Sequence, residues 1–296
     1  MPLLGPLALV AGGAWLSYAR RWQLSFFFCL GTTLWWFGIE PRADRNWKAE
    51  YRRQPTATLA GDEVLVRDVR DFEFRTEQDF DARWRERRVH LSALRGVDVF
   101  VSHWGNPWIA HALVSFDFGE EGYLTASVET RQEVGEGYSA LRGFFRQYEI
   151  IYLLAEEADV VRLRTNARQD ETVRLYRTKM TPEDARSFFA AYLSWMNGNA
   201  RQPEWYNALT NNCTSLYTSW LLVNGVGGLS RWDWRLIANG KADEMLYELG
   251  VLETRGLTFA ELAKGSMVPR GLARDGFSQS VRRAVGITQD LAGAVR

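Results

Sequence analysis

Two long apolar runs open the chain and are the strongest pattern of hydrophobic positions in it. Residues 3–19 carry no charge, Arg20 and Arg21 follow, and residues 22–39 form a second uncharged run. Each run is close to the minimum length for a membrane-spanning helix. The positive residues follow the first run, whereas in a cleaved signal peptide they precede it. We therefore predict a transmembrane helical hairpin over residues 1–40, with its turn at Arg20 and Arg21.

The charges around these runs predict a topology. The positive-inside rule places the turn of the hairpin in the cytoplasm and everything after Ile39 on the outer side of the membrane. Arg42, Arg45 and Lys48 flank the second run and partly oppose this assignment. Aromatic residues that suit anchors at the lipid boundary lie in or near both runs: Trp15, Trp22, Trp35, Trp36 and Trp47.

After the hairpin, the pattern of apolar positions predicts an α+β domain. Residues 41–66 are polar and contain Pro55, so we expect a linker there. Residues 77–94 place apolar side chains at helical spacing, with arginine and glutamate on the other side. Alternating positions then predict three strands, of which the last two form a hairpin. The strands are expected at 97–104, 111–118 and 123–130.

The second half of the domain continues the mixed pattern. Thr181, Pro182 and an acidic first turn are typical of a helix start, and that helix should continue to about Met196. We expect the domain to cover residues 67–280, with a loosely ordered polar tail at 281–296. A short helix is further predicted at 139–147, and strands at 150–154 and 171–177.

One cysteine lies outside the apolar runs, and its surroundings favour a chemical role. Cys213 belongs to the stretch from Tyr206 to Trp220, within the polar sequence Asn-Asn-Cys-Thr. Asn211 and Asn212 are good N-cap residues, and apolar positions recur at helical spacing after them, so we expect Cys213 in the first turn of a helix. The positive end of the helix dipole favours thiolate over thiol there.

A free cysteine is often only a small buried apolar residue, and this is the structural alternative for Cys213. A core thiol would lie in an apolar run, as Cys29 does, whereas Cys213 follows two asparagines. An oxidising compartment would pair cysteines in disulfides, and Cys213 has no partner on the outer side of the membrane. We therefore interpret Cys213 as a nucleophile.

A thiolate nucleophile needs a histidine to take and return a proton, and a third group to orient that histidine. The chain offers His90, His103 and His111. His90 belongs to the charged 77–94 segment and is expected at the surface. His111 begins a strand that would hold it against a helix end, so we take it as the base, with His103 as the runner-up. A structural role is at least as common for an isolated histidine near a strand.

The predicted hairpin decides which carboxylate orients His111. Period-two geometry puts His111 and Asp117 on one face of the first strand, and Ser127 and Glu129 on one face of the second. A one-residue change of register inverts which faces coincide, and the sequence leaves the register open. Glu129 is the leading orienting group, and Ser127 and Asp117 are the alternatives. Each of them also fits an ordinary hairpin residue.

Acyl transfer further requires hydrogen-bond donors for the oxyanion. The backbone N–H of Cys213 is one, and Asn211, Asn212 and Tyr206 are side-chain candidates, with Ser127 as a further substrate contact.

Composition excludes several other classes of function. The formal net charge is +0 with both signs mixed along the chain, which does not fit a general nucleic-acid binder. Three scattered histidines and one cysteine lack the spacing of zinc ligands, so we expect no metal. No glycine-rich phosphate loop is present, and we expect no cofactor.

Five runs of residues, in order, are similar to a known family: His111-Ala-Leu-Val-Ser-Phe, Ser127-Val-Glu-Thr-Arg131, the segment from Tyr138 to Glu149, Val161-Arg-Leu-Arg-Thr165 and the segment from Tyr206 to Thr214. Together they resemble the Lnb N-terminal periplasmic domain family. The resemblance implies a circularly permuted papain-like fold of the NlpC type, in which the histidine strand precedes the cysteine helix. The expected fold class is therefore α+β, with this domain preceded by the transmembrane hairpin.

The resemblance also implies an activity. Family members of known activity transfer an acyl chain from a phospholipid or a neighbouring lipid to the N-terminal cysteine of a bacterial lipoprotein. Carried over to this chain, Cys213 would form the thioester, His111 would act as acid and base, and Glu129 would orient it. The implied protein is a thiol acyltransferase or lipid hydrolase of the bacterial inner membrane, with its main domain in the periplasm and a phospholipid or lipoprotein as substrate.

Two alternatives remain open: a cysteine peptidase or amidase that acts on cell-wall peptides, and a non-catalytic scaffold of the envelope. In the protein that gives the family its name, further membrane segments follow this domain. We expect none after it here, so its acceptor need not be the same. The sequence leaves the oligomeric state open.

Overall fold

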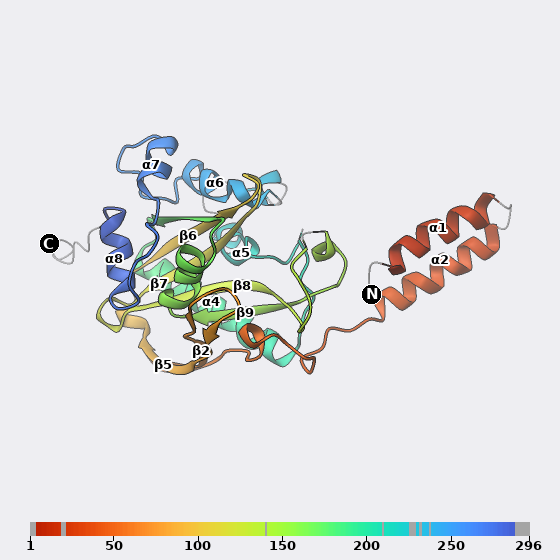
Figure 1. The fold of residues 1–296 in the computed structure, drawn as a ribbon, viewed down its shortest axis with the longest axis horizontal. Coiled ribbons are helices and arrows are strands. Elements are labelled where there is room, and N and C mark those ends of the chain that lie inside the picture. The colour runs from red at the N-terminus through yellow and green to blue at the C-terminus, as the bar shows by residue number, and fades with distance from the viewer. Residues whose placement is uncertain are drawn as a thin grey trace.

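One large sheet forms the centre of the structure, a computed structural model that describes residues 4–18, 22–139, 141–208, 210–224, 229–230, 233–236 and 238–287. The sheet has eight strands in the order β1-β2-β9-β8-β7-β6-β10, with β5 paired to β2 beside that path (Figure 1). Neighbouring strands are antiparallel, except that β2 meets β9 in parallel. The strands are β1 Thr56–Ala60, β2 Glu63–Arg70, β5 Trp84–His90, β6 Gly96–Trp104, β7 Ala110–Asp117, β8 Tyr123–Arg131, β9 Glu149–Ala155 and β10 Glu171–Arg177, and a separate ribbon pairs β3 Glu73–Phe74 with β4 Phe80–Asp81.

Helices cover both faces of the sheet. On one face Phe116 of β7 packs against Phe189 of α4, with ring centroids 4.8 Å apart. On the other face Leu113 of β7 belongs to an apolar cluster with Val160 of α3 and Phe277 of α8. Strand β7 is therefore buried along its whole length, as expected for a strand covered on both sides. The α-helices that follow β9 along the chain are α3 Glu157–Arg162, α4 Pro182–Arg201, α5 Ser215–Val223, α6 Ala242–Glu248, α7 Phe259–Gly265 and α8 Phe277–Ala284. The π-helical turn η5 Leu163–Ala167 directly follows α3.

Helix α4 starts as its sequence predicts. The Thr181 side chain accepts a hydrogen bond from the backbone N–H of Asp184, and the backbone N–H of Thr181 donates one to the Asp184 carboxylate. This capping box satisfies donors that the first turn would otherwise leave unpaired, and Pro182 occupies a position where its missing N–H costs nothing.

The predicted transmembrane hairpin is wrong, and with it the fold class as stated. Helix α1 Leu4–Tyr18 has 15 residues and α2 Trp22–Phe37 has 16. At about 1.5 Å per residue such helices span roughly 24 Å, less than the hydrocarbon core of about 30 Å. Within the described residues, no helix has both the length and the apolar character needed to cross a membrane. The protein is a mixed α and β domain on one sheet, and the turn expected at Arg20 and Arg21 lies outside the described residues.

The predicted helix at 77–94 is also wrong, because this segment forms β4 and β5. Val89 of β5 pairs with Val64 of β2 and is buried, so a tertiary partner overrides the helical spacing of the apolar residues. The neighbouring linker expected at 41–66 contains β1 and the start of β2, and Trp47 within it is buried.

The C-terminal segment is more ordered than its polarity predicts. Arg282 of α8 is 1% exposed and donates two hydrogen bonds to Glu157 of α3 and one to Asp98 of β6, at 2.8 to 2.9 Å. These ion pairs hold α8 against the sheet, so residues 281–287 are not the loosely ordered tail that was predicted for 281–296. Residues 288–296 lie outside the described residues.

Candidate active site

His111 and Glu129 meet because of the register of the β7–β8 hairpin. Leu113 pairs with Ser127, and Asp117 pairs with Tyr123, which leaves five residues in the loop. An odd number of loop residues puts odd-numbered positions of both strands on the same face. His111 and Glu129 therefore project to the same side, where Nε2 of His111 lies 3.1 Å from Oε1 of Glu129. The question that the sequence left open is settled by this register.

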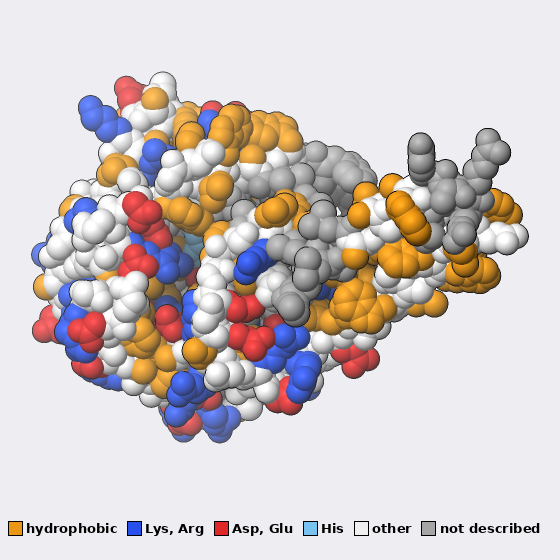
Figure 2. Space-filling model, turned by 45° about the vertical axis from the view of Figure 1, so that its right-hand side comes forward, with side chains coloured by type: hydrophobic (Ala, Val, Ile, Leu, Met, Phe, Trp, Pro, Cys, Tyr) orange, Lys and Arg blue, Asp and Glu red, His pale blue; other side chains and the backbone are white. Residues whose placement is uncertain are grey.

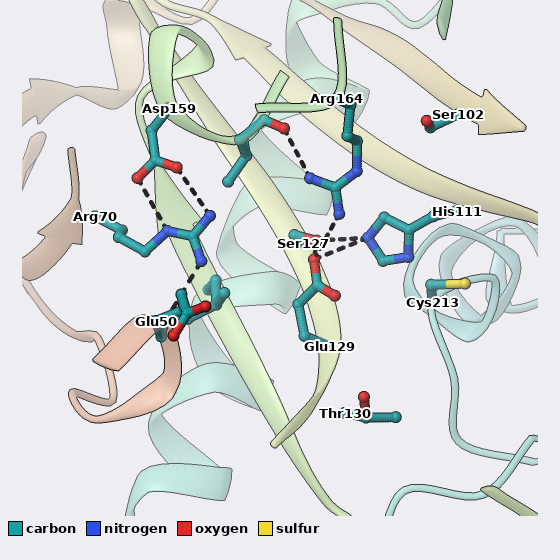
Figure 3. Close-up of polar contacts among 12 residues, drawn as sticks. Glu50, Arg70, Ser102, His111, Ser127, Glu129, Thr130, Asp159, Arg164 and Cys213 are labelled. Atoms are coloured by element: carbon teal, nitrogen blue, oxygen red, sulfur yellow. Dashed lines mark hydrogen bonds and ion pairs between the residues drawn. The ribbon is translucent and has the colours of Figure 1, made fainter. Parts of the chain in front are cut away.

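Ser127 and Arg164 also contact the carboxylate of Glu129 (Figure 3). The Ser127 hydroxyl donates to Glu129 Oε1 at 2.7 Å and accepts from His111 Nε2 at 2.8 Å. Arg164, in the π-helical turn η5, donates from Nη2 to the same Glu129 oxygen at 3.0 Å. Its other terminal nitrogen donates to the carbonyl of Val160 at 2.7 Å, which fixes the guanidinium. Oε1 of Glu129 thus meets three donors: the Ser127 hydroxyl, Arg164 Nη2 and His111 Nε2.

Cys213 lies just before α5 and not in its first turn. The helix begins at Ser215, and Thr214 is its N-cap residue. Asn212 shapes this turn, because its Oδ1 accepts from the backbone N–H of Thr214 at 2.8 Å. The predicted helix start is therefore misplaced by two residues, although the polar asparagine run does precede the helix.

The thiol of Cys213 meets the imidazole from the side opposite to Glu129. Nε2 of His111 is engaged by Ser127 and Glu129, and the other ring nitrogen, Nδ1, lies on the side of Cys213 (Figure 3). Nδ2 of Asn239 lies 3.6 Å from Sγ. Thiol, imidazole and carboxylate thus form one continuous chain of contacts.

The charges in this series of contacts favour an ion pair between Cys213 and His111. Burial raises the pKa of Glu129, but the charges of His111 and Arg164 and the Ser127 hydroxyl hold this pKa well below its usual range. Burial lowers the pKa of His111, yet the Glu129 carboxylate and the hydrogen bonds raise it to about 9 overall. Burial raises the pKa of the Cys213 thiol, but the hydrogen bond and charge of His111, together with Ala112 N–H and Asn239, lower it overall. These shifts favour the pair of thiolate and imidazolium over the pair of thiol and neutral imidazole.

These residues line a cavity of about 270 Å³ that reaches Cys213. A second cavity of about 470 Å³ shares Glu129, Tyr138 and Arg164 with the first, so the two adjoin. Their walls carry charges of both signs, contributed by Lys48, Glu50, Arg70, Glu77, Glu129, Arg164, Arg168, Asp170 and Glu171. Among the residues that the structure describes, no three potential metal ligands are grouped so as to hold an ion.

The other predicted site residues divide into two groups. Tyr206 lines the cavity and hydrogen-bonds to Tyr138. Asn211 and Asn212 are occupied elsewhere: Asn211 Nδ2 donates to Glu204 at 3.1 Å, and Asn212 Nδ2 donates to the carbonyl of Ala208 at 2.7 Å. Neither asparagine is among the residues that line the cavity at Cys213.

The runner-up base, His103, contacts a backbone carbonyl. Nε2 of His103 contacts the carbonyl of Gly240 at 3.2 Å, and burial lowers the pKa of His103. A neutral imidazole donates this hydrogen bond, so His103 supports the backbone at Gly240. His90 is exposed and contacts Glu121, 2.7 Å away.

Sequence reasoning missed two residues of the site. Arg164 comes from a turn 35 positions after Glu129, and Asn239 from a segment 26 positions after Cys213. The run Val161-Arg-Leu-Arg-Thr165 had marked the first of them as part of a resemblance without a role. Nothing in the local sequence distinguishes Asn239, because only the tertiary fold brings it to the sulfur.

Comparison with known proteins gives one match. The family model described as the Lnb N-terminal periplasmic domain matches residues 80–240, which is more than half of the chain. The matched span contains His111, Glu129, Cys213 and Asn239. Neither a curated protein nor a solved structure matches the chain.

Proposed function

The chain belongs to the Lnb N-terminal periplasmic domain family, and from its site we propose that this periplasmic domain is a cysteine-dependent acyltransferase or hydrolase. The observation that carries the proposal is the arrangement of Cys213, His111 and Glu129 at the wall of one cavity, with Nε2 of His111 3.1 Å from Glu129 and its other ring nitrogen on the side of Cys213 (Figure 3). A nucleophile, a base and a group that orients the base are the three parts that thiol acyl transfer requires.

The first half-reaction makes a thioester. The Cys213 thiolate attacks the acyl carbonyl carbon, a carbon–sulfur bond forms, and the carbonyl electron pair moves to oxygen. When this oxyanion collapses, the bond to the leaving alcohol or amine breaks, and the His111 imidazolium gives that leaving group its proton. Glu129 keeps the imidazole turned toward the sulfur throughout, because its carboxylate holds Nε2.

The second half-reaction releases the acyl group. Neutral His111 takes a proton from water or from an acceptor amine, whose oxygen or nitrogen attacks the thioester carbon. The carbon–sulfur bond then breaks and returns the electron pair to Cys213 as thiolate, beside the protonated His111. Water as acceptor gives hydrolysis, and an amine of a lipoprotein gives N-acylation.

A lipid acyl donor at the inner membrane is the substrate class that the apolar surface favours. Helices α1 and α2 expose large apolar side chains, and few charged ones interrupt this orange surface in Figure 2. Trp108 and Trp234 are also exposed and lie in contact, with ring centroids 5.8 Å apart. Tryptophan suits the boundary between lipid and water. A phospholipid or a lipoprotein that presents its ester at this boundary is therefore the proposed substrate.

A cysteine peptidase or amidase on cell-wall peptides is the second candidate. The specific observation in its favour is the lining of the two cavities, where Glu77, Asp170 and Arg168 are among the charged groups. Charged walls suit a substrate with amines and carboxylates better than an acyl chain. A scaffold without activity would be favoured by a Cys213 that is both buried and remote from His103 and His111. Cys213 is buried, with 4% of its surface exposed, but it lies beside His111 (Figure 3).

The test compares turnover of two substrate classes by the purified protein. We expect release of labelled fatty acid from a phospholipid, or its transfer to a lipoprotein amine, and loss of that activity in Cys213→Ala. Cys29→Ala is the matched control, because it removes the other cysteine and leaves the site intact. Cleavage of a peptide amide with no action on lipid would favour the second candidate. Equal turnover by wild type and Cys213→Ala would refute both.

A further inference from the structure

Asn239 is the side-chain amide that lies against the sulfur of Cys213, and the proposed mechanism has so far given it no part. We propose that Asn239 is a catalytic residue, whose Nδ2 donates a hydrogen bond to the oxyanion that forms when Cys213 attacks an acyl carbonyl. This inference rests on the proposed function and adds the group that stabilises its transition state.

The orientation of the amide follows from its second contact. Oδ1 of Asn239 accepts a hydrogen bond from the backbone N–H of Ala110 at 3.0 Å. Only the carbonyl oxygen of the amide can accept from an N–H, so the NH₂ group must be the end that faces the thiol. Nδ2 lies 3.6 Å from Sγ, and Asn239 lines the same cavity as Cys213 and His111. A donor is therefore already aimed at the reacting atoms.

Gly240 explains why the amide stays in place. Its N–H donates to the carbonyl of Trp108 at 3.0 Å, and its own carbonyl accepts from Nε2 of His103. A Cβ added at Gly240 would lie 2.3 Å from the carbonyl oxygen of Pro107 and 2.4 Å from the carbonyl carbon of Trp108. These are backbone atoms of the loop before β7, so this residue must be glycine for the two segments to approach so closely.

The chemistry of the step gives the donor its role. In the resting site the negative charge is on sulfur, and on attack it moves to an oxygen attached to the carbon that the sulfur has bonded. A donor beside Sγ is then within reach of that oxygen, and a fixed donor at this position costs no reorganisation.

The other predicted donors are less well placed. Asn212 directs its NH₂ group to Ala208, and Asn211 directs its own to Glu204. The Tyr206 hydroxyl is paired with Tyr138. Asn239 is thus the side chain among the candidates whose donor meets the nucleophile directly.

The experiment compares two reactions of Cys213 in the full-length protein. Acylation by p-nitrophenyl butyrate forms an oxyanion, whereas alkylation by iodoacetamide displaces iodide at a saturated carbon and forms none. We expect Asn239→Ala to slow acylation roughly 100-fold or more, the usual cost of one lost oxyanion donor. Alkylation at the thiolate plateau should change less than about threefold, because it needs no such donor. Asn224→Ala, at the far end of α5, is the matched control and should alter neither rate.

Each outcome decides a different point. Equal acylation of wild type and Asn239→Ala overturns the inference, and so does an equal fall in acylation and alkylation, which would make Asn239 only a support of the thiolate. Wild type that is alkylated but never acylated at Cys213 instead refutes the proposed function. Gly240→Ala is the second variant: it should displace Asn239 and slow acylation selectively, and unchanged acylation in a folded Gly240→Ala would also contradict the inference.

Discussion

Replacing Glu129 with glutamine would remove the charge beside His111 and keep the shape of the side chain. The carboxylate oxygen lies 3.1 Å from Nε2 of the buried His111. A hydrogen bond to a charged group of this kind contributes about 1.5–3 kcal/mol. Since one pKa unit corresponds to about 1.4 kcal/mol, the change amounts to about one to two units. A carboxylate favours the protonated imidazole, so its loss lowers the pKa of His111 from about 9.

The assay is the pH dependence of kcat/KM for an ester whose leaving group needs the His111 proton. In wild type, activity should fall as the pH rises through about 9, because the imidazolium is then lost. In Glu129→Gln this alkaline limb should move down by about one to two units. Glu120→Gln, in the turn of the same hairpin, is the control and should leave the limb in place. An alkaline limb that stays near 9 in Glu129→Gln, or moves upward, would refute the reasoning.

Three further changes have defined outcomes. Arg164→Met should reduce kcat more than it alters KM, because the guanidinium orients the carboxylate and does not hold the substrate; a change in KM alone would contradict this. His103→Ala should slow acylation yet keep the alkaline limb near 9, and loss of that limb would identify His103 as the base. Arg282→Met should lower the free energy of unfolding in urea by about 3–5 kcal/mol, because Glu157 then remains buried without its cation and Asp98 keeps Arg177; a loss below about 1 kcal/mol would contradict it.

Local pattern was sufficient where a short segment determines its own structure. The β7–β8 hairpin has alternating residues with a glycine at each end of its turn, and it forms where predicted. The cap at Thr181 predicts the start of α4 because its hydrogen bonds lie within one turn. The register that joins His111 to Glu129 depended on the loop length, which the sequence did not determine.

Long-range pairing accounts for the predictions that were wrong. The apolar residues of 77–94 have helical spacing, but pairing with β2 makes β5 a strand. Arg87, which was expected on the charged side of a helix, forms an ion pair with Glu156. The polar C-terminal segment holds the buried Arg282, whose partners lie more than 120 positions earlier. Charged residues lie at the surface unless residues of opposite charge pair with them, and here only the fold brings those partners close.

The apolar runs at the N-terminus show the limit of composition. The second run is uncharged as far as Ile39, but α2 ends at Phe37, and Arg146 of the β8–β9 loop donates to the carbonyls of Trp36 and Ile39. The length of the uncharged run therefore predicted a longer helix than the chain forms. The site shows the same limit, since Arg164 and Asn239 reach it from distant segments.

The central claim is that Cys213 carries the acyl group during the reaction. The most direct measurement is to quench the protein with acid during turnover of an acyl ester and to locate the acyl group by tandem mass spectrometry of the proteolytic peptides. The account predicts an acyl group on the peptide that contains Cys213, removable by neutral hydroxylamine and absent from Cys213→Ala. An acyl group found only on another residue, or turnover that leaves no acyl group on Cys213 at any time of quenching, would contradict it.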